Sequence, residues 1–118
     1  GIASGINNAV ARTAGLLAIA VLGIVALATF AASLDSNLNA LALPPGVRAA
    51  LVAQQNKLLG ITIPSGLSSA THVMIQNTIS ESFVTSFRVI MLIGAALALA
   101  SALFSLLLIE GKPAKKAA

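Results

Sequence analysis

The chain has 118 residues, of which 58% are hydrophobic and 8% are charged, whereas about a quarter of the residues in an average soluble domain carry a charge. This composition argues against a soluble globule. The absence of cysteine excludes disulfides, thiolate catalysis and cysteine-ligated metals. The net charge of +4 comes mostly from scattered cations in a chain without tyrosine or tryptophan, so nucleic acid is not an expected partner.

Two uncharged runs dominate the sequence, residues 13–34 and residues 89–109. As helices, each would be about 30 Å long, which matches the thickness of the hydrocarbon core of a bilayer. We therefore predict an all-α integral membrane fold with two transmembrane helices, at about residues 5–33 and 88–109. A signal peptide is an alternative explanation of the first run, but its apolar region is usually only about 7–15 residues long.

Small residues mark the first predicted span. Gly1 and Gly5 form a GxxxG pair, and Gly15 and Gly23 follow within the apolar run. Inside a membrane, small residues let the backbone of another helix approach closely. We predict that these glycines pack against neighbouring helices, although the general abundance of alanine and glycine in this chain offers a simpler explanation.

Polar residues gather at the start of the same span, at Asn7, Asn8 and Arg12. Asn8 and Arg12 are four residues apart and therefore share one helical face, where unpaired polar groups are costly in a membrane. We predict that the three side chains line a cytoplasmic cavity or a contact between domains. In the alternative interpretation, Arg12 extends to the cytoplasmic headgroups and the asparagines lie in water.

The connecting segment, residues 34–87, is predicted to be extracytoplasmic and contains two breaks rich in proline and glycine, at residues 44–46 and 64–66. Apolar residues recur on one side of residues 47–59 and again over residues 67–87. These patterns predict two amphipathic helices, the second of which leads directly into the second span.

The second predicted span carries Gly94 and Ala98 at helical spacing, which predicts another packing face. It is followed by residues 110–118, a tail with three lysines. Because cytoplasmic segments of membrane proteins are enriched in lysine and arginine, we predict that this tail and the N-terminal end are both cytoplasmic.

Few residues could carry chemistry. The three carboxylates, Asp35, Glu81 and Glu110, and the single histidine, His72, lie outside both uncharged runs. An acid inside a span would be the usual proton carrier, and His72 has no second histidine or cysteine at metal-ligand spacing. We therefore expect no enzyme activity, no cofactor, no metal site and no proton carrier in these residues. An interfacial or solvated position is expected for His72.

Residues 1–23, GIASGINNAVARTAGLLAIAVLG, resemble the penultimate helix of the fourteen-helix drug:proton antiporters of the major facilitator superfamily. The similarity lies in the order of a small residue, Ser-Gly, two asparagines and Arg-x-x-Gly before a glycine-spaced apolar run. Residues 82–91, SFVTSFRVIM, resemble the aromatic-led start of the last helix of that family. In the family a long extracytoplasmic loop with amphipathic pieces joins these two helices.

The resemblance implies that residues 1–118 are one membrane segment, the C-terminal part of a multidrug exporter that works by alternating access. The start at Gly1, without methionine, fits this expectation. The implied partners are the bilayer, the other helices of the parent and, in the complete protein, small hydrophobic or cationic drugs. The implied location is a bacterial inner membrane. The alternative is a freestanding two-span protein that assists or regulates a membrane complex.

Overall fold

A computed structural model describes residues 1–110, and every regular element in them is a helix. Residues 111–118, which hold the predicted basic tail, lie outside the described residues. In chain order the elements are the α-helix α1 (Ile2–Asn39), the α-helix α2 (Pro45–Val52), the 3-10 helix η1 (Gln55–Gly60) and the α-helix α3 (Ser69–Glu110). The predicted all-helical class, with two long apolar helices, is confirmed.

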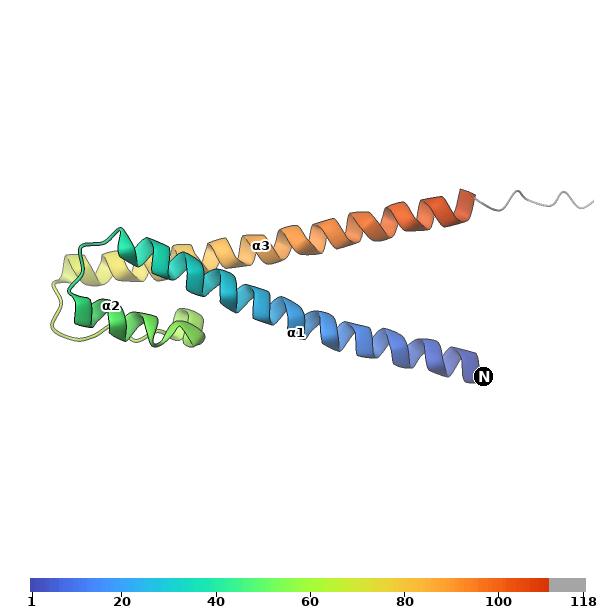
Figure 1. Cartoon of the computed structure of the whole chain (residues 1–118), viewed down its shortest axis with the longest axis horizontal. Coiled ribbons are helices and arrows are strands. Elements are labelled where there is room, and N and C mark those ends of the chain that lie inside the picture. Colours follow the sequence, from blue (N-terminus) through green and yellow to red (C-terminus); the bar gives the residue numbers. More distant parts are fainter. Residues whose placement is uncertain (111–118) are drawn as a thin grey trace, which may run out of the picture.

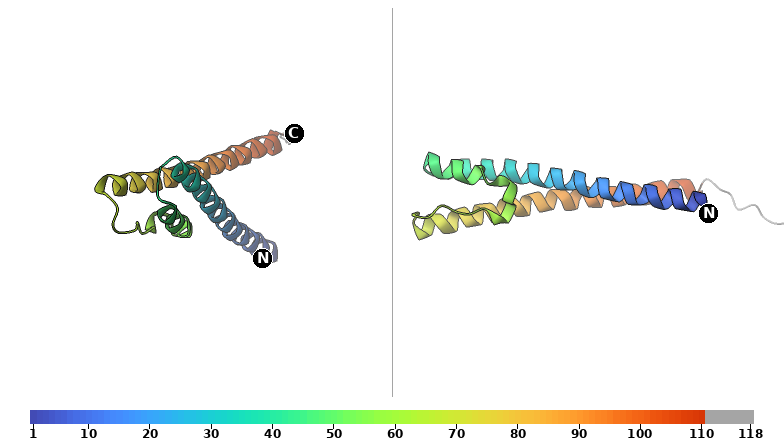
Figure 2. Two further views of the ribbon diagram at one scale, coloured as in Figure 1. Left: turned by 60° about the vertical axis from the view of Figure 1, so that its left-hand side comes forward. Right: turned by 90° about the horizontal axis from the view of Figure 1, so that it is seen from below.

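The two long helices run in opposite directions, meet at one end of the molecule and diverge toward the other (Figure 1). The chain therefore has the shape of a narrow V, with α2 and η1 beside the joined end. The N-terminus and the end of α3 both lie at the open end. The same divergence is visible from another side in the left-hand view of Figure 2.

A small apolar core holds the joined end together. Phe30, Leu34 and Leu38 follow one another at intervals of four residues, so they lie on one face of α1. The face of α3 that carries Ile75 and Ile79 contributes to the same core. The buried members are Phe30, Leu34, Leu38, Leu51, Ile61, Ile75 and Ile79. Burial of a side chain of this size contributes about 1.5–3 kcal/mol, so this cluster is the main source of cohesion between the helices.

The helix α1 is longer than the sequence predicts. The polar residues 33–37 predict its end at about residue 33, yet it continues to Asn39. Leu34 and Leu38 are almost fully buried in the core, and this packing favours another two turns of helix over the local preference for a stop. The polar side chains between them find partners, since Asp35 accepts a bond from Arg48 and Asn37 donates one to Ser82.

The predicted helix over residues 47–59 is divided into α2 and η1. Pro45 stands at the first position of α2, where its missing N–H costs nothing. At the other end, the Gln54 side chain donates to the carbonyls of Ala50 and Thr62 and accepts from the Thr62 N–H, all at 3.1 Å. These bonds draw the chain into a turn that brings Ile61 into the core, which a continuous helix would prevent.

The helix α3 runs without a break from Ser69 to Glu110, so the segment predicted as an amphipathic helix and the second predicted span form one helix. Gly66, with φ at +93°, turns the chain just before it. The Ser68 hydroxyl oxygen then accepts a hydrogen bond from the Thr71 N–H at 3.2 Å, which caps the new helix.

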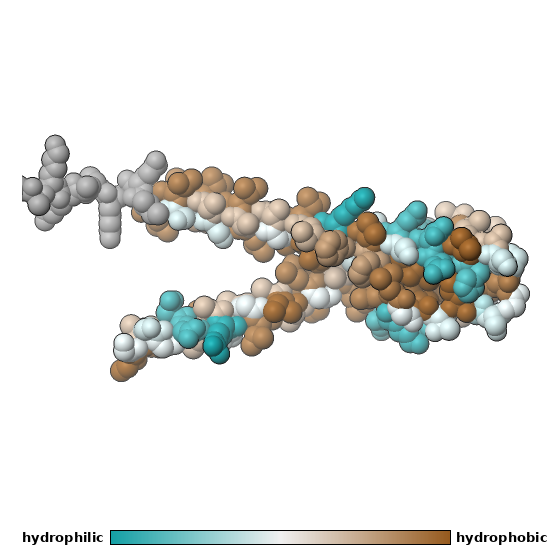
Figure 3. All heavy atoms as spheres, turned by 180° about the vertical axis from the view of Figure 1, so that it is seen from behind, coloured by the Kyte–Doolittle hydropathy of each residue, from teal (hydrophilic) through white to brown (hydrophobic). Residues whose placement is uncertain are grey.

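Both long helices are long and apolar enough to cross a membrane, within Ile2–Asn39 and Ser69–Leu108. In their most apolar stretches only 6% and 0% of the residues are buried by the rest of the chain. Figure 3 shows this apolar surface on both arms, with polar residues mostly over the joined end and near the start of α1. A helix from the core of a soluble protein would instead be largely covered.

The burial of Leu51 in the core leads to a prediction about the stability of α2. Leu51→Ala removes a fully buried side chain, and we expect it to destabilise the packing of α2 by about 2–5 kcal/mol. Hydrogen–deuterium exchange of the α2 amides should accelerate, with little change in the apolar arms. The matched control is Leu59→Ala, because Leu59 lies on neighbouring η1 and is 55% exposed. Equal exchange in the two variants would contradict the assigned role of Leu51.

Candidate functional site at the helix crossing

Polar side chains fasten α1 to α3 beside the apolar core. Ser82 is fully buried, and its hydroxyl accepts a hydrogen bond from Asn37 Nδ2 at 3.1 Å while donating to the Thr78 carbonyl at 2.8 Å. Ser86 is also buried and donates to the Ala26 carbonyl across the interface at 2.8 Å. These bonds fix the register of the two helices, since a shift along either helix would leave buried polar groups without partners.

An ion pair ties α2 to α1. Arg48 Nη2 lies 2.7 Å from Asp35 Oδ1, with the two side chains 41% and 48% exposed. Because water screens a pair this exposed, it contributes no more than about 1 kcal/mol. The pair therefore orients α2 rather than stabilising the fold.

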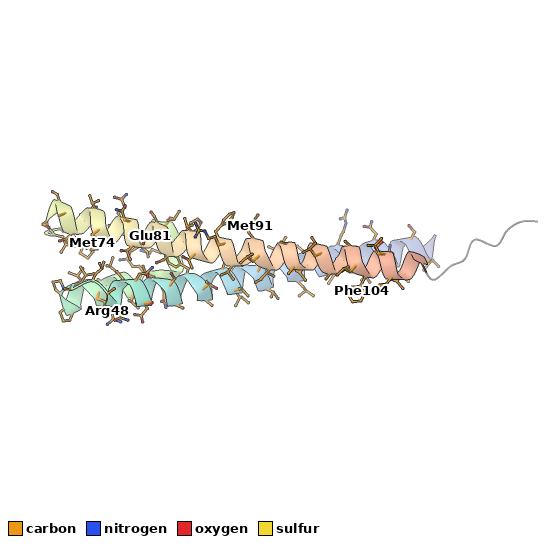
Figure 4. The ribbon with its side chains drawn as sticks, turned by 90° about the horizontal axis from the view of Figure 1, so that it is seen from above. Arg48, Met74, Glu81, Met91 and Phe104 are labelled. Atoms are coloured by element: carbon orange, nitrogen blue, oxygen red, sulfur yellow. The ribbon has the colours of Figure 1, made fainter. Side chains whose placement is uncertain are left out.

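A polar groove runs along the contact between α1 and α3. It has a volume of about 670 Å³ and is lined by Ser33, Asn37, Ser80, Glu81, Val84, Thr85 and Arg88. Figure 4 labels Glu81 on α3 and Arg48 at the opposite side of the helix pair. Among the described residues the single ion pair joins Arg48 to Asp35, so neither Glu81 nor Arg88 has a counter-ion there.

An apolar hollow of about 270 Å³ lies between the arms just beyond the crossing. It is lined by Leu22, Gly23, Ala26, Leu58, Phe83, Ser86, Phe87 and Ile90. The Leu58 backbone has φ 52° and ψ −121°, a conformation that glycine ordinarily adopts in a tight turn. The strained backbone places an apolar side chain from η1 at the point where the arms separate.

Asn7, Asn8 and Arg12, the predicted polar site residues, are all exposed on α1 near its N-terminal end. Arg12 precedes Phe30 by 18 residues, or five helical turns, so it belongs to the same face of α1 that packs on α3. Asn8 lies one turn further along that face. The structure brings Asn8 and Arg12 near neither the groove nor the core.

The contact between Ser86 and Ala26 also fixes the level of Arg12 along α3. Arg12 lies 14 residues before Ala26, and Ala100 lies 14 residues after Ser86, which is about 21 Å along each helix. Arg12 is thus level with the middle of the uncharged run 89–109, not with its end. This position could not be obtained from the sequence, because it depends on how the two helices are aligned.

No family model matches this chain, and no curated protein or solved structure matches it.

The predicted packing residues lie outside the contact between α1 and α3. A Cβ atom built on any of Gly1, Gly5, Gly15, Gly23 and Gly94 would meet no atom within 4 Å beyond its chain neighbours and the adjacent backbone of its own helix, and Ala98 is exposed. Among these predicted packing residues, only Gly23 lines the apolar hollow between the arms. Packing of these residues against further helices stays a prediction.

The histidine and carboxylate side chains form no metal-binding cluster in the part of the chain that the structure describes. No group of three histidine, cysteine, aspartate or glutamate side chains there could hold a metal ion. His72 is exposed and lines a shallow hollow with Thr62 and Gln76. Sequence reasoning named Glu81 only as a carboxylate outside the spans, and missed Asn37, Ser82 and Arg88, because serine and asparagine in an amphipathic helix resemble ordinary surface residues.

The buried hydroxyl of Ser82 allows a direct test of the crossing. We expect a double-mutant cycle of Asn37→Ala and Ser82→Ala to give a coupling free energy of about 1 kcal/mol, measured by thermal unfolding of the purified chain in detergent. The control is Thr85→Ala, because the Thr85 hydroxyl bonds only to the Glu81 carbonyl of its own helix. A coupling indistinguishable from zero would show that the two side chains do not hold the helices together.

Proposed function

We propose that this chain is a membrane-spanning helical hairpin that forms the last two spans of a major facilitator-type multidrug exporter. The observation that supports this most is the bare apolar surface of both arms, of which the chain itself buries almost nothing. Leaving such a surface in water would be costly, whereas lipid and the helices of a larger protein match its chemistry.

The geometry of Arg12 favours a larger parent over a freestanding hairpin. With the uncharged run of α3 inside the bilayer, the level of Arg12 lies within the hydrocarbon layer. A charged group there needs a partner or a water-filled cavity, and residues 1–110 offer neither a carboxylate nor a third helix at that level. Gly5 and Gly15, close to Arg12 on the same helix, leave room for an approaching backbone.

Within such an exporter this chain would be a structural pair of helices. Neither uncharged run contains an acid, so the proton carriers and most of the drug-binding surface would belong to other helices of the parent. The same proposal places the molecule in a bacterial inner membrane, with residues 34–87 outside and both ends in the cytoplasm, and assigns it no enzymatic activity.

The topology can be measured directly because the chain has no cysteine. Single cysteines at Ser36, Ser69 and Ala3 occupy exposed positions, two at the joined end and one at the open end. In intact cells we expect an impermeant maleimide to label the first two and to label Ala3→Cys only after permeabilisation. Labelling of all three positions in intact cells would contradict a membrane-spanning hairpin.

The parent assembly is tested by restoring the chain to the reading frame upstream of Gly1, which we expect to encode about twelve further apolar helices. In that full-length protein, Arg12→Ala should abolish resistance to cationic drugs at unchanged membrane abundance. Arg12→Lys should restore little, because helix ends or loop carbonyls of the parent would be held by the planar fork of the guanidinium, which lysine lacks.

Thr13→Ala is the matched control, since the Thr13 hydroxyl bonds only to the Ala9 carbonyl one turn earlier. Full drug resistance in the Arg12→Lys variant would show that Arg12 serves only to contact the headgroups at the membrane surface. A start codon immediately before Gly1, without an upstream extension, would instead favour the freestanding two-span protein.

A further inference from the structure

The polar groove between α1 and α3 lies where the outer lipid headgroups would be. Arg88 is the last charged residue before the uncharged run 89–109, so in a spanning hairpin it stands at the boundary of the hydrocarbon. Glu81 lies seven residues earlier, about 10 Å further from the membrane along α3. The groove therefore presents a cation near the hydrocarbon and an anion further out.

This order of charges matches a zwitterionic phospholipid. In such a lipid the phosphate is next to the glycerol and the acyl chains, and the ammonium group lies beyond it. We propose that the groove binds a phosphatidylethanolamine headgroup, with Arg88 on the phosphate and Glu81 on the primary ammonium. The proposal rests on the proposed membrane-spanning function, because in water no headgroup would be at this level.

The side chains of the groove suit both ends of the headgroup. Arg88 has no counter-ion among the described residues, and a guanidinium can donate two parallel hydrogen bonds to a phosphate. The Ser33 hydroxyl, which also lines the groove, accepts the weak bond from Asn37 at 3.4 Å and can donate its own hydrogen to the headgroup. At the outer end, the Glu81 carboxylate can accept N–H bonds from an ammonium group.

The same residues discriminate against the other common headgroups. The lining includes no aromatic side chain, whereas a choline group, which has no N–H to donate, is usually held by aromatic faces. A glycerol headgroup carries no positive charge to compensate Glu81, and its phosphate would be close to an uncompensated carboxylate. The groove should therefore prefer phosphatidylethanolamine to phosphatidylcholine and to phosphatidylglycerol.

The test uses the purified full chain with equal amounts of the three lipids, all with the same acyl chains, and counts bound lipids by native mass spectrometry. We expect phosphatidylethanolamine to be retained at least about fivefold over each of the others, as one additional charge-assisted hydrogen bond would give. Glu81→Gln should remove the preference over phosphatidylcholine, and Arg88→Gln should lower the retention of all three lipids.

Both substitutions are at exposed helix positions, so the fold should be preserved. The controls are Glu110→Gln at the far end of α3 and Lys57→Gln on η1, which remove the same charges elsewhere. Equal binding of phosphatidylglycerol and phosphatidylethanolamine, or an unchanged preference in Glu81→Gln, would overturn the headgroup site. So would an equal loss of preference in the two controls.

Cysteine labelling of the same chain in vesicles separates this proposal from the one on which it rests. If Ser36→Cys and Ala3→Cys report opposite sides of the vesicle membrane and the lipid preference is absent, the headgroup site is wrong while the spanning hairpin is retained. If both positions are on one side, the spanning function itself fails, and the headgroup site fails with it.

Discussion

The packing of Phe30, Leu34 and Leu38 of α1 into a common core with α3 and α2 is the contact on which the rest of the structure depends. It extends α1 beyond its sequence-predicted end, brings Asn37 to Ser82 and gives Ile61 a place to be buried. The polar groove and the apolar hollow both lie along the contact that this core sets up. Away from the core the two arms have almost no contact with the rest of the chain.

Features with a strong local cause could be predicted from the sequence. Two long uncharged runs predict two long apolar helices, and the breaks at residues 44–46 and 64–66 predict where helices cannot continue. Features that depend on contacts between distant residues could not. The extension of α1 to Asn39 and the division between α2 and η1 follow from core packing and from the Gln54–Thr62 bonds.

The geometry of the candidate site also depends on contacts between distant residues and could not be predicted from the sequence. Asn8 and Arg12 were predicted to share a face, but the level of Arg12 along α3 depends on the contact of Ser86 with Ala26, 60 residues apart in the chain. The presence of Glu81 and Arg88 in one groove could not be predicted without the position of α1, since Ser33 and Asn37 form its other wall. Spacing along one helix does not contain that information.

The contact between α1 and α3 lies near one end of both helices, and this position has a mechanical consequence. Beyond the contact of Ala26 with Ser86, each helix extends 24 residues toward the open end, to Ile2 and to Glu110. Each rod is therefore a lever of about 36 Å, and a change of about 10° in the angle between them moves its tip by about 6 Å. Repacking of a few side chains at the joined end would thus be amplified into a displacement as wide as a helical turn at the open end.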